Sequence, residues 1–343
     1  MPKTEDYEYL LELENVRAVE MVGDTLFVRV SKKLPDEQLD WNQNLENIVM
    51  DVDFVIIDEN EEPDKNASYD LLYNTVPEGR EDRSQKIRPP QAGISEMHIA
   101  GSAATGGHFP AIVVDNSKGK WSDDIKLGDK VRLSNHHVYG MSGDADFGDK
   151  IIQPSPMDGG DHNDAVGRLV GYVPFEDGVS VDIAARDFNN AESSKPYSLE
   201  DEYGGGVFRG DYEDLHGRHL VKTGYRTGVT SGIVESVGAS VNVNMGDGTV
   251  KFRNVMITTN MGSPGDSGSP VYVKDTGEIV ATLFAGSPRS TILCRVDEIE
   301  ESLGVEILPN DNGEPDDPPE EDDVGFWCRL LQSVGIDRYV PWC

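Results

Sequence analysis

A serine lies in the glycine-rich stretch "PGDSGSP" (residues 264–270), directly before the apolar run "VYV". A serine hydroxyl is a poor nucleophile at neutral pH, so a reactive serine needs an adjacent base and a third group that orients this base. Gly265 can adopt the backbone geometry that directs N–H groups at an oxyanion, and Gly268 leaves room for an acyl group. The stretch therefore predicts either a nucleophilic Ser267 or a tight turn between strands, and other residues must decide.

The chain has seven histidines, of which His136 and His137 are the best placed to supply the base. Both lie in "VRLSNHHVYG", where an apolar strand is expected to end in Ser-Asn and a small turn to follow. Adjacent side chains of a strand point to opposite faces, so we expect only one of the two to face a given site. His216 and His219 have a spacing suited to a metal, but no cysteine or further histidine completes a site, and no metal or cofactor is expected.

The orienting carboxylate should be buried, which favours an aspartate inside an apolar strand. The stretch "VSVDIAA" places Asp182 in such a run, although an exposed position on an alternating strand would give the same pattern. The competing aspartates lie in loop-like sequence: Asp161, Asp164, Asp177 and Asp187. The candidate residues then follow along the chain in the order His137, Asp182, Ser267.

The elements that must position these residues are mostly short strands. Residues 91–307 contain many β-rich runs, such as "FPAIVVD", "VGRLVGYV" and "EIVATLFA", separated mainly by Gly, Asp, Asn or Pro. Only "VDEIEESLG" is typical of a helix. This regular spacing of short β-rich runs and turns predicts a mainly β, antiparallel fold, and the length of the segment suits two barrels better than one.

The remaining segments flank this β-rich domain. Residues 1–60 predict a small α+β domain with a hairpin around Gly23-Asp24, a short helix over "PDEQLDWNQNL" and a third strand in "VMDVDFVIIDE". Residues 61–90 are charged and rich in turn formers, which is typical of a linker.

The C-terminal residues divide into two parts. Residues 308–323 form an acidic, proline-rich spacer, and residues 324–343 form an aromatic segment that carries Cys328 and Cys343. This segment either docks on its own protein or joins subunits of a homo-oligomer. Its cysteines either close one loop as a disulfide or stay reduced, as is usual in a cytosol.

The composition excludes some classes of function. The chain has 63 Asp and Glu against 30 Lys and Arg, with a formal net charge of -33, and its cations are not clustered. Nucleic-acid binding needs clustered cations and is therefore not expected. The acids are spread over every segment, as in proteins of salt-loving organisms. The N-terminus lacks the pattern of a secretory signal and no stretch is apolar enough to span a membrane, so we expect a cytoplasmic protein of cellular or viral origin.

The three candidate stretches resemble those of the chymotrypsin-like serine proteases, in which histidine, aspartate and serine follow in the same order. "LSNHHV" is similar to the "TNNHV" motif of the bacterial HtrA and Deg-type proteases, "VDIAA" resembles their aspartate motif, and "GDSGSP" departs from the commonest "GDSGGP" only at Ser269. Longer stretches, among them "LVKTGYRTGVTSGIV", resemble prokaryotic relatives of the plant narrow-leaf protein, a trypsin-like serine protease. The resemblance is specific from residue 91 onward.

The resemblance implies a double β-barrel with His137 and Asp182 on the first barrel and Ser267 on the second. Ser267 would be the nucleophile, His137 the general base and then acid, and Asp182 the acceptor for the second N–H group of this histidine. Backbone N–H groups of Gly265 and Ser267 would form the oxyanion hole. His136 would be the neighbour of the base.

The same resemblance implies a substrate pocket. Met261 would lie at its base, and Phe284, Ala285 and Gly286 would line one wall. An uncharged base favours a medium-sized apolar side chain over Lys or Arg, whereas the surface acidity would attract basic polypeptides. Asp266 corresponds to the residue that pairs with a freed N-terminus in the digestive zymogens. Since no activation site is visible before residue 95, we expect a site that is competent without cleavage.

Three functions remain open at this point. The first is a serine endopeptidase that hydrolyses peptide bonds of proteins or peptides through an acyl-enzyme. The second is a self-processing protease that cuts its own chain near residues 59–90 or 309–323. The third is a non-catalytic scaffold or binding protein that retains the fold. The presence of all three candidate residues favours an enzyme over a scaffold.

The acid excess leads to a prediction about salt. If the charge of -33 is an adaptation to concentrated salt, dialysis into dilute buffer should unfold the protein, because self-repulsion is then no longer screened. Circular dichroism before and after dialysis from molar sodium chloride measures the effect. Retention of the full signal in dilute buffer would reject the adaptation.

Overall fold

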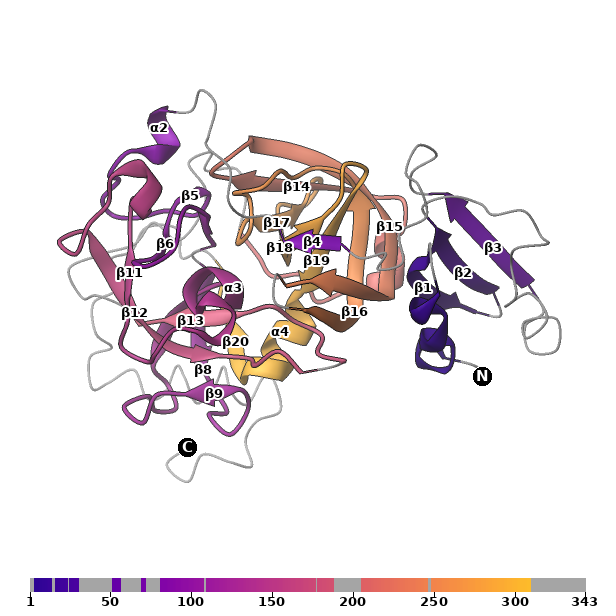
Figure 1. The fold of residues 1–343 in the computed structure, drawn as a ribbon, viewed down its shortest axis with the longest axis horizontal. Helices are drawn as coiled ribbons and strands as arrows, with labels where there is room; N and C mark the ends of the chain where they lie inside the picture. The colour runs from indigo at the N-terminus through magenta and orange to yellow at the C-terminus, as the bar shows by residue number, and fades with distance from the viewer. Residues whose placement is uncertain are drawn as a thin grey trace. The chain divides into compact units, whose positions relative to one another are not determined.

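The mainly β fold expected from the sequence is confirmed by a computed structural model of the chain (Figure 1). Most of residues 81–309 are described, and they belong to one compact unit, Met1–Asn310. The described ranges are 3–13, 16–23, 25–30, 51–56, 69–71, 81–107, 109–176, 178–187, 205–245 and 248–309. The expected helix over "PDEQLDWNQNL", the aromatic segment 324–343 and nearly all of the acidic spacer lie outside these residues.

The first barrel is an eight-stranded sheet in the order β20-β8-β10-β13-β12-β11-β6, with β9 paired to β12. Its strands are β6 (Met97–His98), β8 (Phe109–Val113), β9 (Lys120–Trp121), β10 (Lys130–Ser134), β11 (Lys150–Ile152), β12 (Ala165–Tyr172), β13 (Ala184–Arg186) and β20 (Val305–Ile307). A separate pair, β5 (Ile94–Ser95) and β7 (Thr105–Gly106), lies beside it. In β10, Val131 and Leu133 enter the core, yet Arg132 and Ser134 on the other face are buried too. Both faces of β10 are therefore covered.

The second barrel is closed. Its strands follow in the order β14-β17-β18-β19-β16-β15, and β14 also pairs with β15, so that six strands form a ring. These are β14 (His219–Gly224), β15 (Gly228–Asn244), β16 (Thr249–Thr259), β17 (Pro270–Val273), β18 (Ile279–Gly286) and β19 (Ser290–Arg295). Closure gives every strand two neighbours and leaves few free edges.

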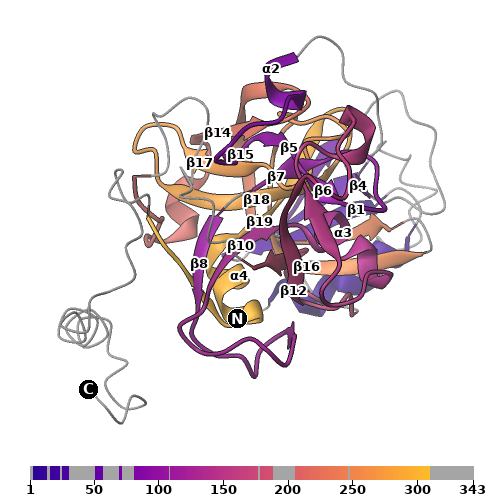
Figure 2. The same ribbon diagram turned by 90° about the vertical axis from the view of Figure 1, so that its left-hand side faces the viewer.

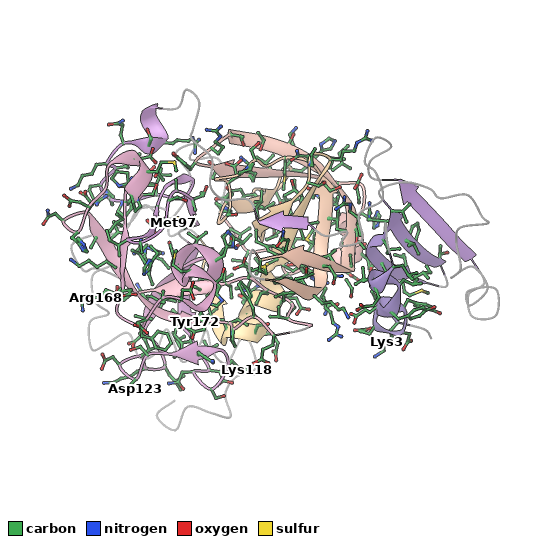
Figure 3. The ribbon with its side chains drawn as sticks, in the orientation of Figure 1. Lys3, Met97, Lys118, Asp123, Arg168 and Tyr172 are labelled. Atoms are coloured by element: carbon green, nitrogen blue, oxygen red, sulfur yellow. The ribbon has the colours of Figure 1, made fainter. Side chains whose placement is uncertain are left out.

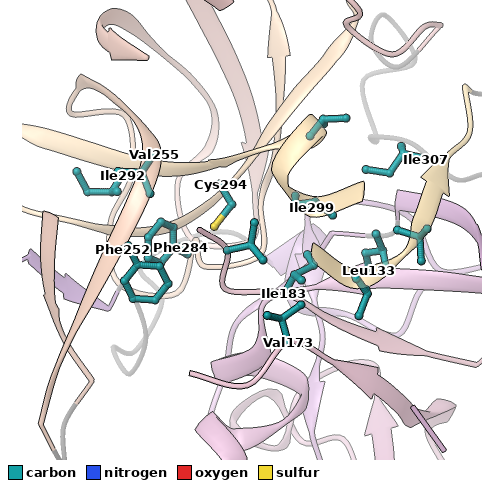
Figure 4. Close-up of a cluster of buried hydrophobic side chains, with 14 of the residues drawn as sticks. Leu133, Val173, Ile183, Phe252, Val255, Phe284, Ile292, Cys294, Ile299 and Ile307 are labelled. Atoms are coloured by element: carbon teal, nitrogen blue, oxygen red, sulfur yellow. The ribbon is translucent and has the colours of Figure 1, made fainter. Parts of the chain in front are cut away.

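A hydrophobic cluster joins the two barrels (Figure 4). Leu133 and Ile183 from the first barrel pack in it with Phe252, Phe284 and Cys294 from the second. The predicted helix is present as α4 (Val296–Leu303), which adds Ile299 to the cluster. The chain then returns to the first barrel as β20, so the last helix and strand hold the two barrels together.

Short helical turns connect the strands. They are α2 (Glu81–Ser84), α3 (His136–Tyr139), η3 (Met141–Gly143), η4 (Pro156–Asp158) and η5 (Tyr212–Leu215). No helix in the described ranges is long and apolar enough to cross a membrane.

The N-terminal strands extend the sheet of the second barrel. β1 (Val16–Val22) and β2 (Thr25–Val30) form the predicted hairpin, and β3 (Asp51–Ile56) lies parallel to β2. β1 pairs with β15, and the 3-10 helix η1 (Thr4–Glu12) is tied to β16 by an ion pair of 2.6 Å between Glu8 and Arg253. These strands thus continue the sheet of the second barrel. The domain boundary at residue 60 stays a prediction.

One strand lies within the segment expected to be a linker. β4 (Tyr69–Leu71) pairs with both β15 and β18. The sequence shows no alternation here, and the strand exists because two neighbouring strand edges supply its hydrogen-bond partners. Figure 2 shows the whole ribbon after a quarter turn.

Candidate active site

His137 is held by Asp182 through two hydrogen bonds. β10 ends at Ser134, and α3 turns the chain so that the His137 ring reaches the carboxylate, with Nδ1 at 2.5 Å from Asp182 Oδ2. The backbone N–H of His137 donates to Asp182 Oδ1 at 3.1 Å. Both side chains are almost completely buried. The two bonds leave the imidazole one orientation and leave its Nε2 as the atom directed away from Asp182.

The expectation of strand alternation at the two histidines was wrong, since both lie on α3 and both are buried. Successive helical residues are turned by about 100° rather than 180°. The His136 ring is therefore directed elsewhere and stacks on Tyr172 with a centroid distance of 4.4 Å (Tyr172 is labelled in Figure 3). Phe175 covers it from another side, at 4.6 Å.

Asp182 is fixed through its backbone as well as its side chain. It lies two residues before β13 rather than inside a strand, and it is completely buried. Asn135 Nδ2 donates to its carbonyl oxygen at 2.8 Å, and its own N–H lies 3.1 Å from Cys294 Sγ on the second barrel. Burial raises the pKa of the Cys294 thiol well above its usual value, so this neighbour stays neutral. Of the competing aspartates, Asp164 instead pairs with Lys86.

Ser267 lies in the turn before β17 and is tied to the first barrel by Thr105. The N–H of Thr105 donates to the Ser267 carbonyl at 2.9 Å, and the Thr105 carbonyl accepts from Ser134 Oγ at 3.0 Å. Ser134 is the last residue of β10, only three positions before His137. Two hydrogen bonds through one threonine thus connect the turn of Ser267 to the strand that leads into α3.

Gly268 is required by a close contact that the sequence did not reveal. Its φ is +90°, and a Cβ atom there would lie 2.1 Å from the Thr105 carbonyl oxygen and 2.3 Å from Ser134 Oγ. The glycine is therefore required for the close approach of the two barrels. The room for an acyl group, predicted from the sequence, stays a prediction.

The turn before Ser267 contains a glycine in the left-handed backbone region. Gly265 has a φ of +104°, and its carbonyl accepts from Thr105 Oγ1 at 2.9 Å. The N–H groups of Asp266, Gly268 and Ser269 are used by carbonyl groups of the protein, at 2.9–3.0 Å. Gly265 and Ser267, whose N–H groups are assigned to the oxyanion hole from the sequence, lie in this same turn, and the oxyanion hole stays a prediction.

Asp266 has a buried lysine as its partner, which the sequence analysis did not foresee. Lys222 Nζ on β14 lies 3.2 Å from Asp266 Oδ2, and both side chains are fully buried. The same carboxylate accepts from the N–H groups of Arg226 and Thr227, at 3.0 and 3.1 Å, and from Ser263 N–H at 3.0 Å. An internal ammonium thus compensates the charge of Asp266. In the sequence, the signal for this ion pair was the single lysine inside the apolar strand "HLVKTG".

The residues expected around a substrate pocket occupy two environments. Met261 is 4% exposed and packs with Val280 and Leu283, while its N–H donates to Thr291 Oγ1 at 3.0 Å. The Phe284 ring is buried against Phe252, so this residue presents its backbone, whose carbonyl accepts from Ser267 Oγ at 3.3 Å. Ala285 and Gly286 end β18 beside it. The pocket itself stays a prediction.

The other titratable clusters of the described residues do not make a metal site. His216 and His219 are both exposed. Across the described ranges, no three His, Cys, Asp or Glu side chains are grouped closely enough to hold a metal ion.

Comparisons with known proteins find similarity in structure only. No protein-family model and no curated protein matches the sequence. Thermobifida fusca protease A is 14% identical with a TM-score of 0.44, covering 64% of this chain and 98% of its own. Cellulomonas bogoriensis chymotrypsin is 17% identical with a TM-score of 0.43, covering 64% and 98%. A glutamic acid specific serine protease is 21% identical with a TM-score of 0.45, covering 64% and 100%.

These solved structures are serine proteases, and their low identities leave the function to be argued from the site itself. The resemblance to prokaryotic relatives of the plant narrow-leaf protein finds no support among the matches and stays a prediction.

The buried ion pair leads to a prediction about stability. Lys222→Met leaves the Asp266 carboxylate buried without a cation, which should lower the free energy of unfolding by about 3 kcal/mol. Lys222→Met combined with Asp266→Asn should regain part of this loss, because the uncompensated charge is gone. Urea unfolding of the three proteins measures both effects.

The matched control is Lys118→Met, which removes an exposed ion pair with Glu301. Exposed pairs contribute about 0–1 kcal/mol, so the control should change stability little. If Lys222→Met is no more destabilising than Lys118→Met, Lys222 does not compensate Asp266.

The environment of His136 leads to a prediction about pH. Burial lowers the pKa of His136 from 6.5 to about 4, although the nearby Asp182 carboxylate opposes the shift. The unfolded chain therefore takes up a proton between pH 6.5 and 4 that the folded chain does not. Stability due to this group is complete above pH 6.5 and falls by a few kcal/mol as the pH drops to about 4.

His136→Phe keeps an aromatic ring in the stack and should remove this part of the pH dependence. Urea midpoints at pH 7 and pH 4.5 measure it, with the exposed His162→Phe as control. An unchanged difference between the two midpoints in His136→Phe would contradict the assignment.

Proposed function

We propose that the protein is a serine endopeptidase in which Ser267, His137 and Asp182 act together. The observation that carries the proposal is the buried bond of 2.5 Å between His137 Nδ1 and Asp182 Oδ2, on a strand end that Thr105 ties to the turn of Ser267. A buried carboxylate that fixes an imidazole, together with a serine in a glycine-rich turn tied to the strand that leads to that imidazole, supports activation of the hydroxyl group.

In the first step, Ser267 Oγ attacks the carbonyl carbon of a peptide bond. Asp182 holds the proton of His137 on Nδ1, which leaves the lone pair on Nε2 to accept the proton of the serine. The imidazolium that results is stabilised by the Asp182 carboxylate, which stays ionised. His137 then donates this proton to the leaving amine as the C–N bond breaks, and the acyl group remains on Ser267.

The N–H groups of Gly265 and Ser267 stabilise the oxyanion of the tetrahedral intermediate. One such donor typically contributes about 3–4 kcal/mol to transition-state stabilisation. Asp266 lies between Gly265 and Ser267 in the chain, and its carboxylate is paired with Lys222. The Asp266–Lys222 pair therefore acts as a positioning element for both N–H groups. The turn is thereby preorganised without prior cleavage of the chain.

In the second step, a water molecule replaces the leaving amine. His137 Nε2 accepts a proton from this water, the hydroxide attacks the acyl carbon, and the bond to Ser267 Oγ breaks with return of the proton to the serine. The products are a carboxylic acid and an amine, and no metal or cofactor takes part in these steps.

The substrate preference follows from the residues that the resemblance places around the pocket. Met261 as an uncharged pocket base favours a medium-sized apolar side chain before the cleaved bond. The backbone of Phe284, Ala285 and Gly286 would face the substrate main chain, since the Phe284 ring is committed to the core.

A fluorophosphonate probe, applied in high salt, tests the assignment. The probe should label the parent and fail to label Ser267→Ala, while His137→Ala should react at least about a thousandfold more slowly. Asp182→Asn should lower the rate by about ten-thousandfold, because the wrong tautomer of His137 would be held. His136→Phe is the matched control and should label normally. Labelling of Ser267→Ala would refute the assignment.

A further inference from the structure

One edge of β18 carries the turn of Ser267. Moving along this edge, Pro270 of β17 pairs with Thr282, the Gly268 N–H donates to the Leu283 carbonyl at 2.9 Å, and Ser267 Oγ donates to the Phe284 carbonyl at 3.3 Å. The segment of Ser267 therefore runs antiparallel along this edge of β18, from Pro270 opposite Thr282 back to Ser267 at Phe284. The edge continues beyond the serine to Ala285 and Gly286.

The chain's own β4 occupies this continuation. Leu71 pairs with Ala285 and Asp70 with Gly286, in antiparallel direction, and Figure 1 shows β4 in purple beside β18. The opposite edge of the same two residues is taken by β19, through Ile292 and Thr291. β4 and Ser267 are thus consecutive neighbours on one strand edge.

The direction of β4 leads toward the serine. Because the pairing is antiparallel, the step from Asp70 to Leu71 runs from Gly286 to Ala285, and the next residue of β18 in that direction is Phe284. The Phe284 carbonyl is the one that Ser267 Oγ contacts. An extended chain that pairs with this edge in the direction of β4 therefore runs toward Ser267, with its backbone in register with β18.

β4 is a short strand, and the chain is anchored on both sides of it. The strand has three residues, with a second, parallel pairing to Val243 and Asn244 of β15. On one side the chain is anchored by β3 in the extended sheet, and on the other by Arg83, whose Nη1 donates to the Gly93 carbonyl and to Thr223 Oγ1, each at 2.9 Å. A short strand is weak alone, whereas tethering at both ends raises its effective concentration at the edge.

We propose that residues 69–71 are a resident occupant of this edge of β18 and compete there with the substrate polypeptide of the proposed function, which would pair with the same edge by strand addition. Main-chain hydrogen bonds to a free strand edge are a general means of peptide recognition, and they accept many sequences. The inference rests on the proposed function for its biological meaning. The competition itself is a property of binding and is measured without catalysis.

The test uses the full chain with Ser267→Ala, which removes cleavage. Asp70→Pro takes away a backbone donor and disfavours strand pairing at β4, and Leu71→Pro is a second variant with the same effect. Fluorescently labelled β-casein, an unstructured polypeptide, is titrated and its anisotropy followed. If β4 occupies the edge nine-tenths of the time, both variants should bind about tenfold more tightly than the Ser267→Ala parent.

The matched control is Asn60→Pro, which places proline directly before the predicted linker and outside β4 and should leave the affinity unchanged. Equal affinity in all four proteins, or no binding in any, would overturn the inference. Equal tightening in Asn60→Pro would also overturn it, because the effect would then belong to the linker and not to the strand.

A second measurement separates this inference from the proposed function. In the active chain, Asp70→Pro should lower the KM for labelled casein about tenfold and leave kcat unchanged, whereas turnover of p-nitrophenyl acetate, too small to pair with β18, should not change. Unchanged KM with normal fluorophosphonate labelling overturns the competition alone. Absent labelling overturns the proposed function, and the anisotropy result still decides whether β4 competes. If the intact mass shows the parent, but not Ser267→Ala, cut just after Leu71, β4 is a substrate and not a resident occupant.

Discussion

The hydrogen bond between Asp182 and His137 depends on the enclosure of a carboxylate between two barrels. A carboxylate in water would orient a histidine weakly, because water competes for both of its oxygen atoms. Here Asp182 is completely buried, and its backbone is bonded to Asn135 on one side and to Cys294 of the second barrel on the other. The core cluster around Cys294, the return of β20 and the close approach at Gly268 all serve to keep that enclosure closed.

Asp182 and Asp266 are both fully buried, and their charges are compensated in different ways. Asp182 receives donors from His137, and no lysine or arginine of the described residues forms an ion pair with it, so its charge is available to an imidazolium that forms nearby. Asp266 is paired with Lys222 and surrounded by backbone donors, so its charge is already neutralised. The first aspartate can respond to a change of charge at His137, and the second holds the turn of Ser267 in one conformation.

Strand addition occurs twice on the second barrel. β1 extends β15 and brings the N-terminal hairpin with it, and β4 fills the edge of β18 next to Ser267. The first addition is supported by side chains, since Glu8 reaches Arg253 and Ser240. The second rests on three residues between two anchors, which makes it the weaker of the two and the one that a competing polypeptide could replace.

The sequence by itself determined the local elements and the order of the candidate residues. Its β-rich runs, the hairpin at Gly23-Asp24 and the helix at Val296–Leu303 follow from periodicity and turn formers within a few residues, which are properties of the local chain. The tertiary structure alone decided which groups meet. It placed Lys222 against Asp266, turned His136 away from Asp182, gave Gly268 its steric reason and made a strand of residues 69–71. Each of these depends on contacts between segments distant in sequence, where burial and the edges of other strands outweigh any local preference.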